Sequence, residues 1–177
     1  MKILVKSLKS LNYKIATAES CTGGLVAKMI TDVSGSSAVF EYGVVTYSNR
    51  AKTNLLGVSE TTLATFGAVS EETAKEMALG ALKLSGADIA LSVTGVAGPE
   101  PSEGKPVGTV CIGVATRDKV LAKTFVFGGK RGDVRRQSAK IALNMALWAL
   151  GETAKKQKLS EKAMDAMKKI TNKIKKK

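Results

Sequence analysis

Apolar residues recur along this chain in two patterns, one typical of helices and one typical of strands. Where they return every third or fourth position they share one face, and this pattern predicts helices over 3–11, 25–33, 51–56, 59–63, 70–85 and 134–150. Short apolar runs rich in β-branched and aromatic residues predict strands over 14–18, 38–48, 88–94, 107–116 and 120–127. Along the last helix, Ile141, Met145, Trp148 and Ala149 are expected to face inward.

The order of these elements predicts the fold class. Strands that alternate with helices indicate an α/β protein, a three-layer α/β/α sandwich on a mixed, mostly parallel sheet of about five strands. The last two strands flank the turn Arg117-Asp118-Lys119 and are expected to form an antiparallel hairpin. In folds of this class, binding crevices lie at the carboxyl ends of the strands.

The organisation changes after residue 150. Residues 1–150 are expected to form one domain, and 151–177 a basic amphipathic helical tail with Leu159, Ala163, Met167, Ile170 and Ile174 at helical spacing. Ten lysines and three acidic residues give this tail a net charge of +7, which leaves +6 of the total +13 on the domain. Such a helix packs on its own body or on a second copy, or binds nucleic acid or a lipid surface. The absence of aromatic residues from the tail weakens the last two alternatives.

Composition excludes several kinds of chemistry. The chain has no histidine, which removes Ser-His-Asp and Cys-His catalysis and any imidazole-ligated metal. Its two cysteines lack the spacing of a metal site, so we expect no metal and no cofactor. No apolar run is long enough to span a membrane and the first ten residues lack a cleavage signal, which favours a cytoplasmic protein.

The turn from the first strand into the second helix is the leading candidate for a catalytic site. Here Ser20 and Cys21 lie beside Thr22, Gly23 and Gly24, and the free amides of a helix N-terminus attract anionic groups. On local sequence alone, a serine or threonine that merely caps the helix is an equally good interpretation.

Two further strand ends carry polar or glycine-rich loops. One contains Tyr47 and, five residues later, Lys52; the other runs through Thr94, Gly95 and Gly98. Without histidine, a serine is activated by a lysine that burial keeps neutral, with a tyrosine to relay the proton. Taken singly, Lys52 is more often a solvent-facing helix residue and Tyr47 a rim residue.

Ordered blocks along the chain resemble the C-terminal domain family of the competence-damage protein CinA. The blocks are Thr17-Ala18-Glu19-Ser20-Cys21-Thr22-Gly23-Gly24, Gly35-Ser36-Ser37, Val45-Thr46-Tyr47-Ser48-Asn49, Ala51-Lys52, Gly67-Ala68-Val69-Ser70, Thr94-Gly95-Val96-Ala97-Gly98-Pro99, Lys105-Pro106-Val107-Gly108-Thr109-Val110 and Arg135-Arg136-Gln137. The enzymatic members of this family are nicotinamide-nucleotide amidohydrolases. The resemblance covers residues 1–150 and leaves the tail unexplained.

The resemblance implies a catalytic set of Ser20, Tyr47 and Lys52 that hydrolyses nicotinamide mononucleotide to nicotinate mononucleotide and ammonia. It also favours a homodimer. Residues expected at the substrate are Glu19, Cys21, Thr22, Gly23, Gly24, Thr94, Gly95, Gly98, Arg131 and Arg135, with Lys130 and Arg136 as further phosphate candidates. Glu19 either orients neighbouring groups or caps a helix.

Two alternatives stay open at this point. Cys21 shares the helix mouth and is a competing nucleophile, although a small thiol is also a common packing residue. In the second alternative the chain is a non-catalytic nucleotide-binding or nucleic-acid-binding module that uses its basic tail.

Overall fold

The computed structural model describes the backbone of residues 1–174 and the side chains of residues 1–152. Its elements in chain order are α1 (Lys2–Leu11), β1 (Ile15–Glu19), α2 (Leu25–Thr31), the 3₁₀ helix η1 (Ser36–Ala38), β2 (Phe40–Val45), α3 (Asn49–Leu56), α4 (Glu60–Phe66), α5 (Glu71–Ser85), β3 (Ile89–Gly95), β4 (Thr109–Thr116), β5 (Val120–Val126) and α6 (Arg131–Ile174).

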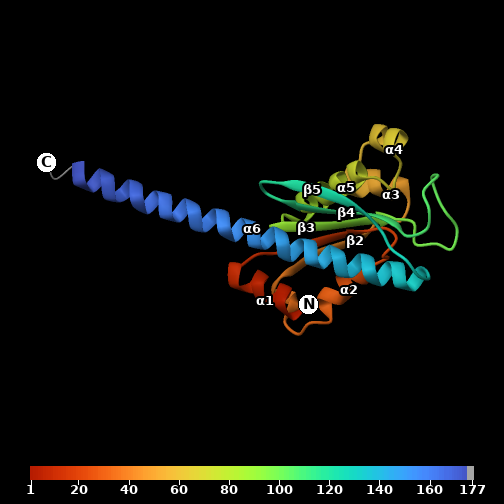
Figure 1. The fold of residues 1–177 in the computed structure, drawn as a ribbon, viewed down its shortest axis with the longest axis horizontal. Helices are drawn as coiled ribbons and strands as arrows, with labels where there is room; N and C mark the ends of the chain where they lie inside the picture. Colours follow the sequence, from red (N-terminus) through yellow and green to blue (C-terminus); the bar gives the residue numbers. More distant parts are fainter. Residues whose placement is uncertain (175–177) are drawn as a thin grey trace.

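The five strands form one mixed sheet in the order β2-β1-β3-β4-β5 (Figure 1). β1 pairs in parallel with β2 and β3, whereas β4 pairs antiparallel with both β3 and β5. Four strands therefore share one direction and β4 alone opposes them. The expected α/β class and the antiparallel hairpin are confirmed, with the pairings divided evenly between parallel and antiparallel.

Helices cover both faces of the sheet and complete the three layers (Figure 1). Helix α5 packs on one face with α3 and α4 against it, and α1, α2 and α6 lie on the other face. Alternation along the strands gives the two faces different side chains. The α6 side presents Ile15, Ile89, Leu91, Val93, Val110, Ile112 and Val114, and the α5 side presents Ala16, Ala18 and Ala90. The small residues on the second face let α5 approach the sheet closely.

Two expectations for the C-terminal region need correction. The helix expected over 134–150 begins earlier, at Arg131, and its backbone continues without a break through Ile174. Trp148 is not in the core: 48% of it is exposed, because α6 turns Ala142, Ala146 and Ala149 toward the sheet instead. The predicted amphipathic packing of the tail concerns side chains beyond residue 152, outside those that the structure describes.

Helices α3 and α5 touch at Gly80, where no larger residue fits. A β-carbon at this position would lie 2.0 Å from the carbonyl oxygen of Leu56. We therefore expect Gly80→Ala to lower the free energy of unfolding by about 2 kcal/mol, although alanine is the better helix former by about 1 kcal/mol. Urea denaturation measures this change. Gly151→Ala, in open space on α6, is the matched control and should be neutral or stabilising; equal effects of the two substitutions would contradict the close approach.

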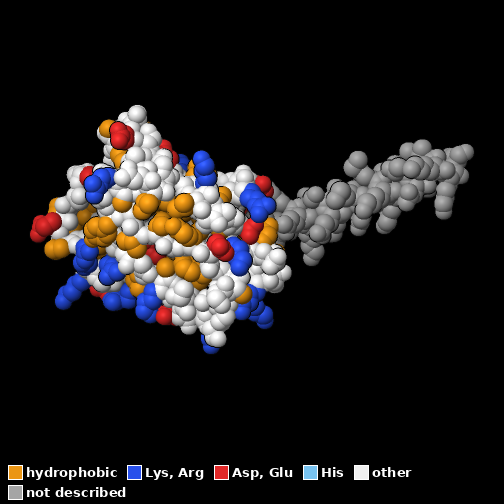
Figure 2. Space-filling view, turned by 180° about the vertical axis from the view of Figure 1, so that it is seen from behind, with side chains coloured by type: hydrophobic (Ala, Val, Ile, Leu, Met, Phe, Trp, Pro, Cys, Tyr) orange, Lys and Arg blue, Asp and Glu red, His pale blue; other side chains and the backbone are white. Residues whose placement is uncertain are grey.

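No helix in the described part of the chain is long and apolar enough to cross a membrane. On the face opposite to the view of Figure 1, lysine and arginine side chains lie around the rim among acidic ones, and apolar side chains gather in the middle (Figure 2). This face therefore carries no continuous basic surface of the kind that follows a nucleic-acid backbone.

Candidate active site

The loops that follow β1, β2 and β3 meet at one edge of the sheet and line an open cavity of about 280 Å³. Ser20 and Cys21 come from the first loop, Tyr47 and Lys52 from the second loop and helix α3, and residues 94–98 from the third. Parallel strands bring their carboxyl ends to the same edge, which explains why residues far apart in sequence converge here. The topology thus assembles the three predicted strand-end loops at one place.

Ser20 sits in a rigid turn at the end of β1. Its N–H donates to the carbonyl oxygen of Val93 on β3 at 2.8 Å, and only 8% of the residue is exposed. Gly23 and Gly24 then adopt positive φ angles of 55° and 89°, which reverse the chain into α2. The backbone of Ser20 is therefore held to β3, which places its side chain at the cavity.

Glu19 caps α2, one of the two roles expected for it. The residue is fully buried, and its carboxylate accepts hydrogen bonds from the N–H groups of Val26 at 3.0 Å and Ala27 at 2.8 Å. A negative charge at this end of a helix is also favoured by the helix dipole. Glu19 therefore fixes the geometry between β1 and α2 and does not itself line the cavity.

Lys52 is buried beside Ser20. Helix α3 begins after Ser48, whose side chain accepts from the N–H of Ala51 at 3.1 Å, so Lys52 falls in the first turn. Only 1% of Lys52 is exposed, and its Nζ lies 3.2 Å from Ser20 Oγ and 3.0 Å from the carbonyl oxygen of Thr46. The interpretation of Lys52 as a solvent-facing helix residue is thereby wrong.

Burial changes the acid–base chemistry of this amine. Desolvation lowers the pKa of Lys52 below its usual 10.5, against smaller opposing effects of Cys21 and Glu103. A lowered pKa increases the fraction of neutral amine, which is the form that accepts a proton. Lys52 and Ser20 thus make a hydrogen-bonded pair of base and hydroxyl.

Cys21 is adjacent to Ser20 but is poorly placed to act as a nucleophile. The thiol is buried, and this burial raises its pKa to about 12 despite the neighbouring lysine. Since the thiolate is the reactive form, a thiol with this pKa is inert at neutral pH.

Tyr47 lines the cavity without contacting the serine–lysine pair. It is 60% exposed, and its hydroxyl accepts a hydrogen bond from Arg131 at 3.0 Å. Arg131 also donates to the carbonyl oxygen of Gly98 at 2.7 Å and so bridges the second and third loops. Within the described residues no hydrogen bond joins Tyr47 to Ser20 or Lys52, so its predicted relay contact is not formed here.

The remaining predicted substrate residues divide into two groups. Thr94, Gly95, Gly98 and Arg131 line the cavity, and the buried hydroxyl of Thr94 donates to the carbonyl oxygen of Ala68. The second group, Thr22, Gly23, Gly24 and Arg135, lies outside the cavity lining. There Arg135 donates to the carbonyl oxygen of Thr22 at 2.7 Å, which stabilises the turn.

Sequence reasoning missed the distal part of the β3–β4 loop, beyond Pro99, as part of this site. Glu100, Ser102 and Glu103 line the cavity, and Glu103 accepts hydrogen bonds from the N–H groups of Ala68 and Val69. An acidic residue in a polar, proline-containing loop gives no local signal of such a contact. In the part of the chain with described side chains, no group of three histidine, cysteine or carboxylate residues could hold a metal ion.

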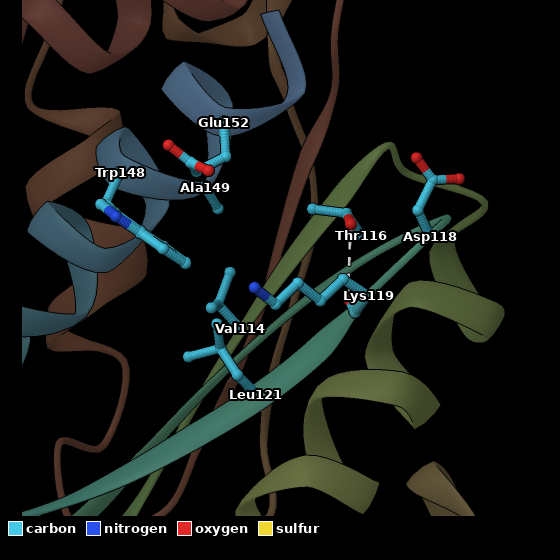
Figure 3. Close-up of a pocket in the computed structure, with 8 residues that line it drawn as sticks. All are labelled: Val114, Thr116, Asp118, Lys119, Leu121, Trp148, Ala149 and Glu152. Carbon is cyan, nitrogen blue, oxygen red and sulfur yellow. Dashed lines mark hydrogen bonds between the residues drawn. The ribbon is translucent and has the colours of Figure 1, made fainter. Parts of the chain in front are cut away.

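A second hollow lies at the far end of β4 and is too small for a nucleotide. It measures about 60 Å³, and Figure 3 shows Val114, Leu121 and Trp148 converging around the amine of Lys119, which lies 5.1 Å from the Trp148 ring. Small-molecule sites usually measure several hundred Å³. The strand-end cavity is the candidate active site because it contains the hydrogen-bonded Lys52 and Ser20 side chains.

Comparison with known proteins assigns this chain to a family. The family model for the CinA C-terminal domain matches residues 1–150. The nicotinamide-nucleotide amidohydrolase PncC of Enterobacter agglomerans is 55% identical over 143 residues, which are 80% of this chain and 87% of that protein. A CinA-like protein of Chloroherpeton thalassium is 56% identical over 78% of this chain, which spans 34% of that longer relative.

Solved structures agree with the sequence match. The competence/damage inducible protein CihA from Agrobacterium tumefaciens superposes with a TM-score of 0.81 at 45% identity, over 85% of this chain and 92% of that one. A CinA superfamily protein from Klebsiella pneumoniae gives a TM-score of 0.82 at 37% identity, over 84% and 94% of the two chains. This chain belongs to the CinA C-terminal domain family.

Proposed function

We propose that this chain hydrolyses the carboxamide of nicotinamide mononucleotide, giving nicotinate mononucleotide and ammonia. The observation that carries the proposal is the buried Lys52 amine, 3.2 Å from Ser20 Oγ in a cavity of about 280 Å³. The amidohydrolase name of the Enterobacter agglomerans relative, 55% identical, supports the choice of reaction and substrate.

In the first half-reaction, Ser20 Oγ attacks the amide carbonyl carbon while neutral Lys52 removes the hydroxyl proton. The tetrahedral intermediate then collapses, the C–N bond breaks, and Lys52 returns the proton to the departing nitrogen. Ammonia leaves, and the nicotinoyl group remains as an ester of Ser20. In the second half-reaction Lys52 deprotonates a water molecule, which attacks the ester carbonyl carbon. The bond to Ser20 Oγ then breaks, Lys52 returns the proton to Ser20 Oγ, and nicotinate mononucleotide leaves as the carboxylate.

The negative charge of each tetrahedral intermediate needs hydrogen-bond donors. The N–H of Ser20 is already used, because it donates to Val93, and that of Gly23 donates to Ser20. In the described part of the chain, the N–H groups of Cys21 and Thr22 donate to no other residue. We assign the role of oxyanion donor to Cys21 first, since it directly follows the nucleophile and lines the cavity.

The substrate phosphate requires a cation, and Arg131 is the arginine that lines the cavity. Its contacts with Tyr47 and Gly98 hold it across the mouth, so we assign Tyr47 to substrate orientation together with Arg131. The homodimer expected from the family, a cytoplasmic location and nucleic-acid binding by the tail stay predictions; sedimentation of the full chain measures the first.

The proposal is tested by ammonia release from nicotinamide mononucleotide. We expect turnover by the wild-type chain, and we expect Cys21→Ala to retain the rate within about threefold because a protonated thiol supplies no nucleophile. No ammonia from the wild type would contradict the proposed activity. Loss of the rate in Cys21→Ala with retention in Ser20→Ala would instead assign the nucleophile to Cys21.

A further inference from the structure

One of the two acidic residues that the β3–β4 loop contributes to the cavity, Glu103, lies in a tight turn. Ser102 and Lys105 exchange backbone hydrogen bonds of 3.2 and 2.9 Å, and Glu103 and Gly104 form the tip with φ angles of 54° and 68°. Positive φ at both central positions is the geometry that favours asparagine or glycine. A glutamate held there against this preference points to a role for its side chain.

The Glu103 carboxylate is fixed in position. It accepts hydrogen bonds from the N–H groups of Ala68 and Val69, both at 3.1 Å, in the loop that precedes α5. A second contact between the same two loops joins the Lys105 amine to the carbonyl oxygen of Phe66 at 3.2 Å. These contacts hold the acidic group at the cavity wall before any ligand arrives.

Charged residues of both signs line the cavity. Among the described residues that line it, the cationic groups are Lys52 and Arg131, and the anionic ones are Glu100 and Glu103. Of these two acids, Glu103 is the one whose carboxylate is held by backbone N–H groups. The cavity therefore offers a fixed negative charge in addition to a cation for a phosphate.

Nicotinamide mononucleotide has a matching pair of charges. Its phosphate is anionic, and its pyridinium ring carries a positive charge a few bonds from the amide that must reach Ser20. That ring charge has to lie inside this cavity, where Arg131 repels it and a carboxylate attracts it.

We propose that Glu103 is a specificity-determining residue that selects a cationic pyridinium ring over an uncharged ring at the same site. This inference rests on the proposed function and adds that the site recognises the positive charge of the substrate ring. A carboxylate already oriented by two amides loses little on binding, because it needs no reorganisation when the ring enters.

The charge of Glu103 also affects the pH dependence of ammonia release. Glu103 acts on Lys52 in the direction that raises its pKa, against desolvation and alongside Cys21. Removal of the Glu103 charge should therefore lower the pKa of Lys52 further. Since the neutral amine is the active base, the rise of the ammonia-release rate with pH should begin at a lower pH in Glu103→Gln.

The experiment compares two ligands that differ in ring charge, nicotinamide mononucleotide and its uncharged 1,4-dihydro form. Their affinities are measured by titration calorimetry on full-length Ser20→Ala protein, which prevents turnover. We expect Glu103→Gln to weaken binding of the cationic nucleotide about tenfold and to change binding of the dihydro form less than twofold. Glu103→Asp, which keeps the charge, should preserve the preference for the cation.

Lys105→Met is the matched control for loop position, because it releases the other contact between the loops and leaves the carboxylate in place. It should leave the ratio of the two affinities unchanged. The inference would be overturned if Glu103→Gln weakened binding of both ligands equally, or weakened neither. It would also be overturned if the Ser20→Ala protein that keeps Glu103 did not prefer the cationic nucleotide. If the Ser20→Ala protein prefers the cationic nucleotide but the wild type releases no ammonia, the proposed hydrolysis fails while the selection of ring charge by Glu103 stands.

Discussion

Replacement of Lys52 with methionine is expected to lower the rate of ammonia release about a thousandfold while the protein becomes more stable. The loss follows from removal of the only described base in hydrogen-bond reach of Ser20 Oγ, at 3.2 Å. The gain follows because the amine is 1% exposed and desolvation lowers its pKa. Methionine has a similar length and removes the free-energy cost of burying an amine. We therefore expect the free energy of unfolding to rise by roughly 1 kcal/mol.

The pH dependence of the free energy of unfolding and of the ammonia-release rate distinguishes the loss of a buried base from a general loss of structure. Because the pKa of folded Lys52 lies below the ordinary 10.5, the unfolded chain binds more protons between these two values. The free energy of unfolding of the wild type should therefore rise with pH across that window, relative to Lys52→Met. The wild-type rate of ammonia release should rise with pH until Lys52 has lost its proton.

Ser20→Ala is the matched variant for these measurements. It should lose the rate as Lys52→Met does, because the nucleophile is gone, but the buried amine remains and so no comparable gain in stability is expected. Urea denaturation and ammonia release on the same preparations make the comparison. A Lys52→Met protein that keeps more than a tenth of the wild-type rate would rule out Lys52 as the general base.

Replacement of Glu19 with alanine is expected to lower the free energy of unfolding by about 3 kcal/mol. The side chain is fully buried, and its loss leaves the N–H groups of Val26 and Ala27 without their acceptor and a cavity behind the turn. Ammonia release should fall as well, because the turn that carries Ser20 loses its connection to α2. Urea denaturation measures the change in stability.

Glu76→Ala is a control with the same number of hydrogen bonds in a more exposed place. Glu76 accepts from the N–H of Ser59 at 2.7 Å and from the hydroxyl of Thr62 at 2.5 Å. Water replaces these contacts, so we expect a loss of about 1 kcal/mol. A Glu19→Ala loss no larger than that of Glu76→Ala would show that burial of the cap adds nothing.

Local sequence was sufficient for most of the fold. The helices predicted over 70–85 and 51–56 end where the pattern places them. Ser70 caps α5, with its hydroxyl oxygen accepting from the N–H of Thr73, and Gly57 ends α3 with φ of 67°. Both signals act within a few residues, as does the periodicity of apolar positions. The strand over 38–48 was the poorest prediction, because β2 spans only Phe40–Val45 and η1 occupies part of the preceding segment.

The candidate site was predicted in part. Strand ends with polar loops identified Ser20, Tyr47, Lys52 and Thr94, and the resemblance to the CinA family implied that the first three act together. The hydrogen bond of Tyr47 to Arg131 and the place of Glu103 at the cavity were not predictable, since each joins positions more than 30 residues apart. The same limit applies to Trp148, since helical spacing gives two candidate faces and only the neighbouring strands decide between them.

The sequence by itself determined the order of the elements, the type of fold, the exclusion of histidine chemistry and the residue types available at the strand ends. These depend on short-range periodicity, capping and composition. Only the tertiary structure decided that Lys52 is buried against Ser20, that burial raises the pKa of Cys21 to about 12, and that Glu103 joins the cavity wall. Desolvation and charge depend on every element packed around a group, and those elements come from distant parts of the chain.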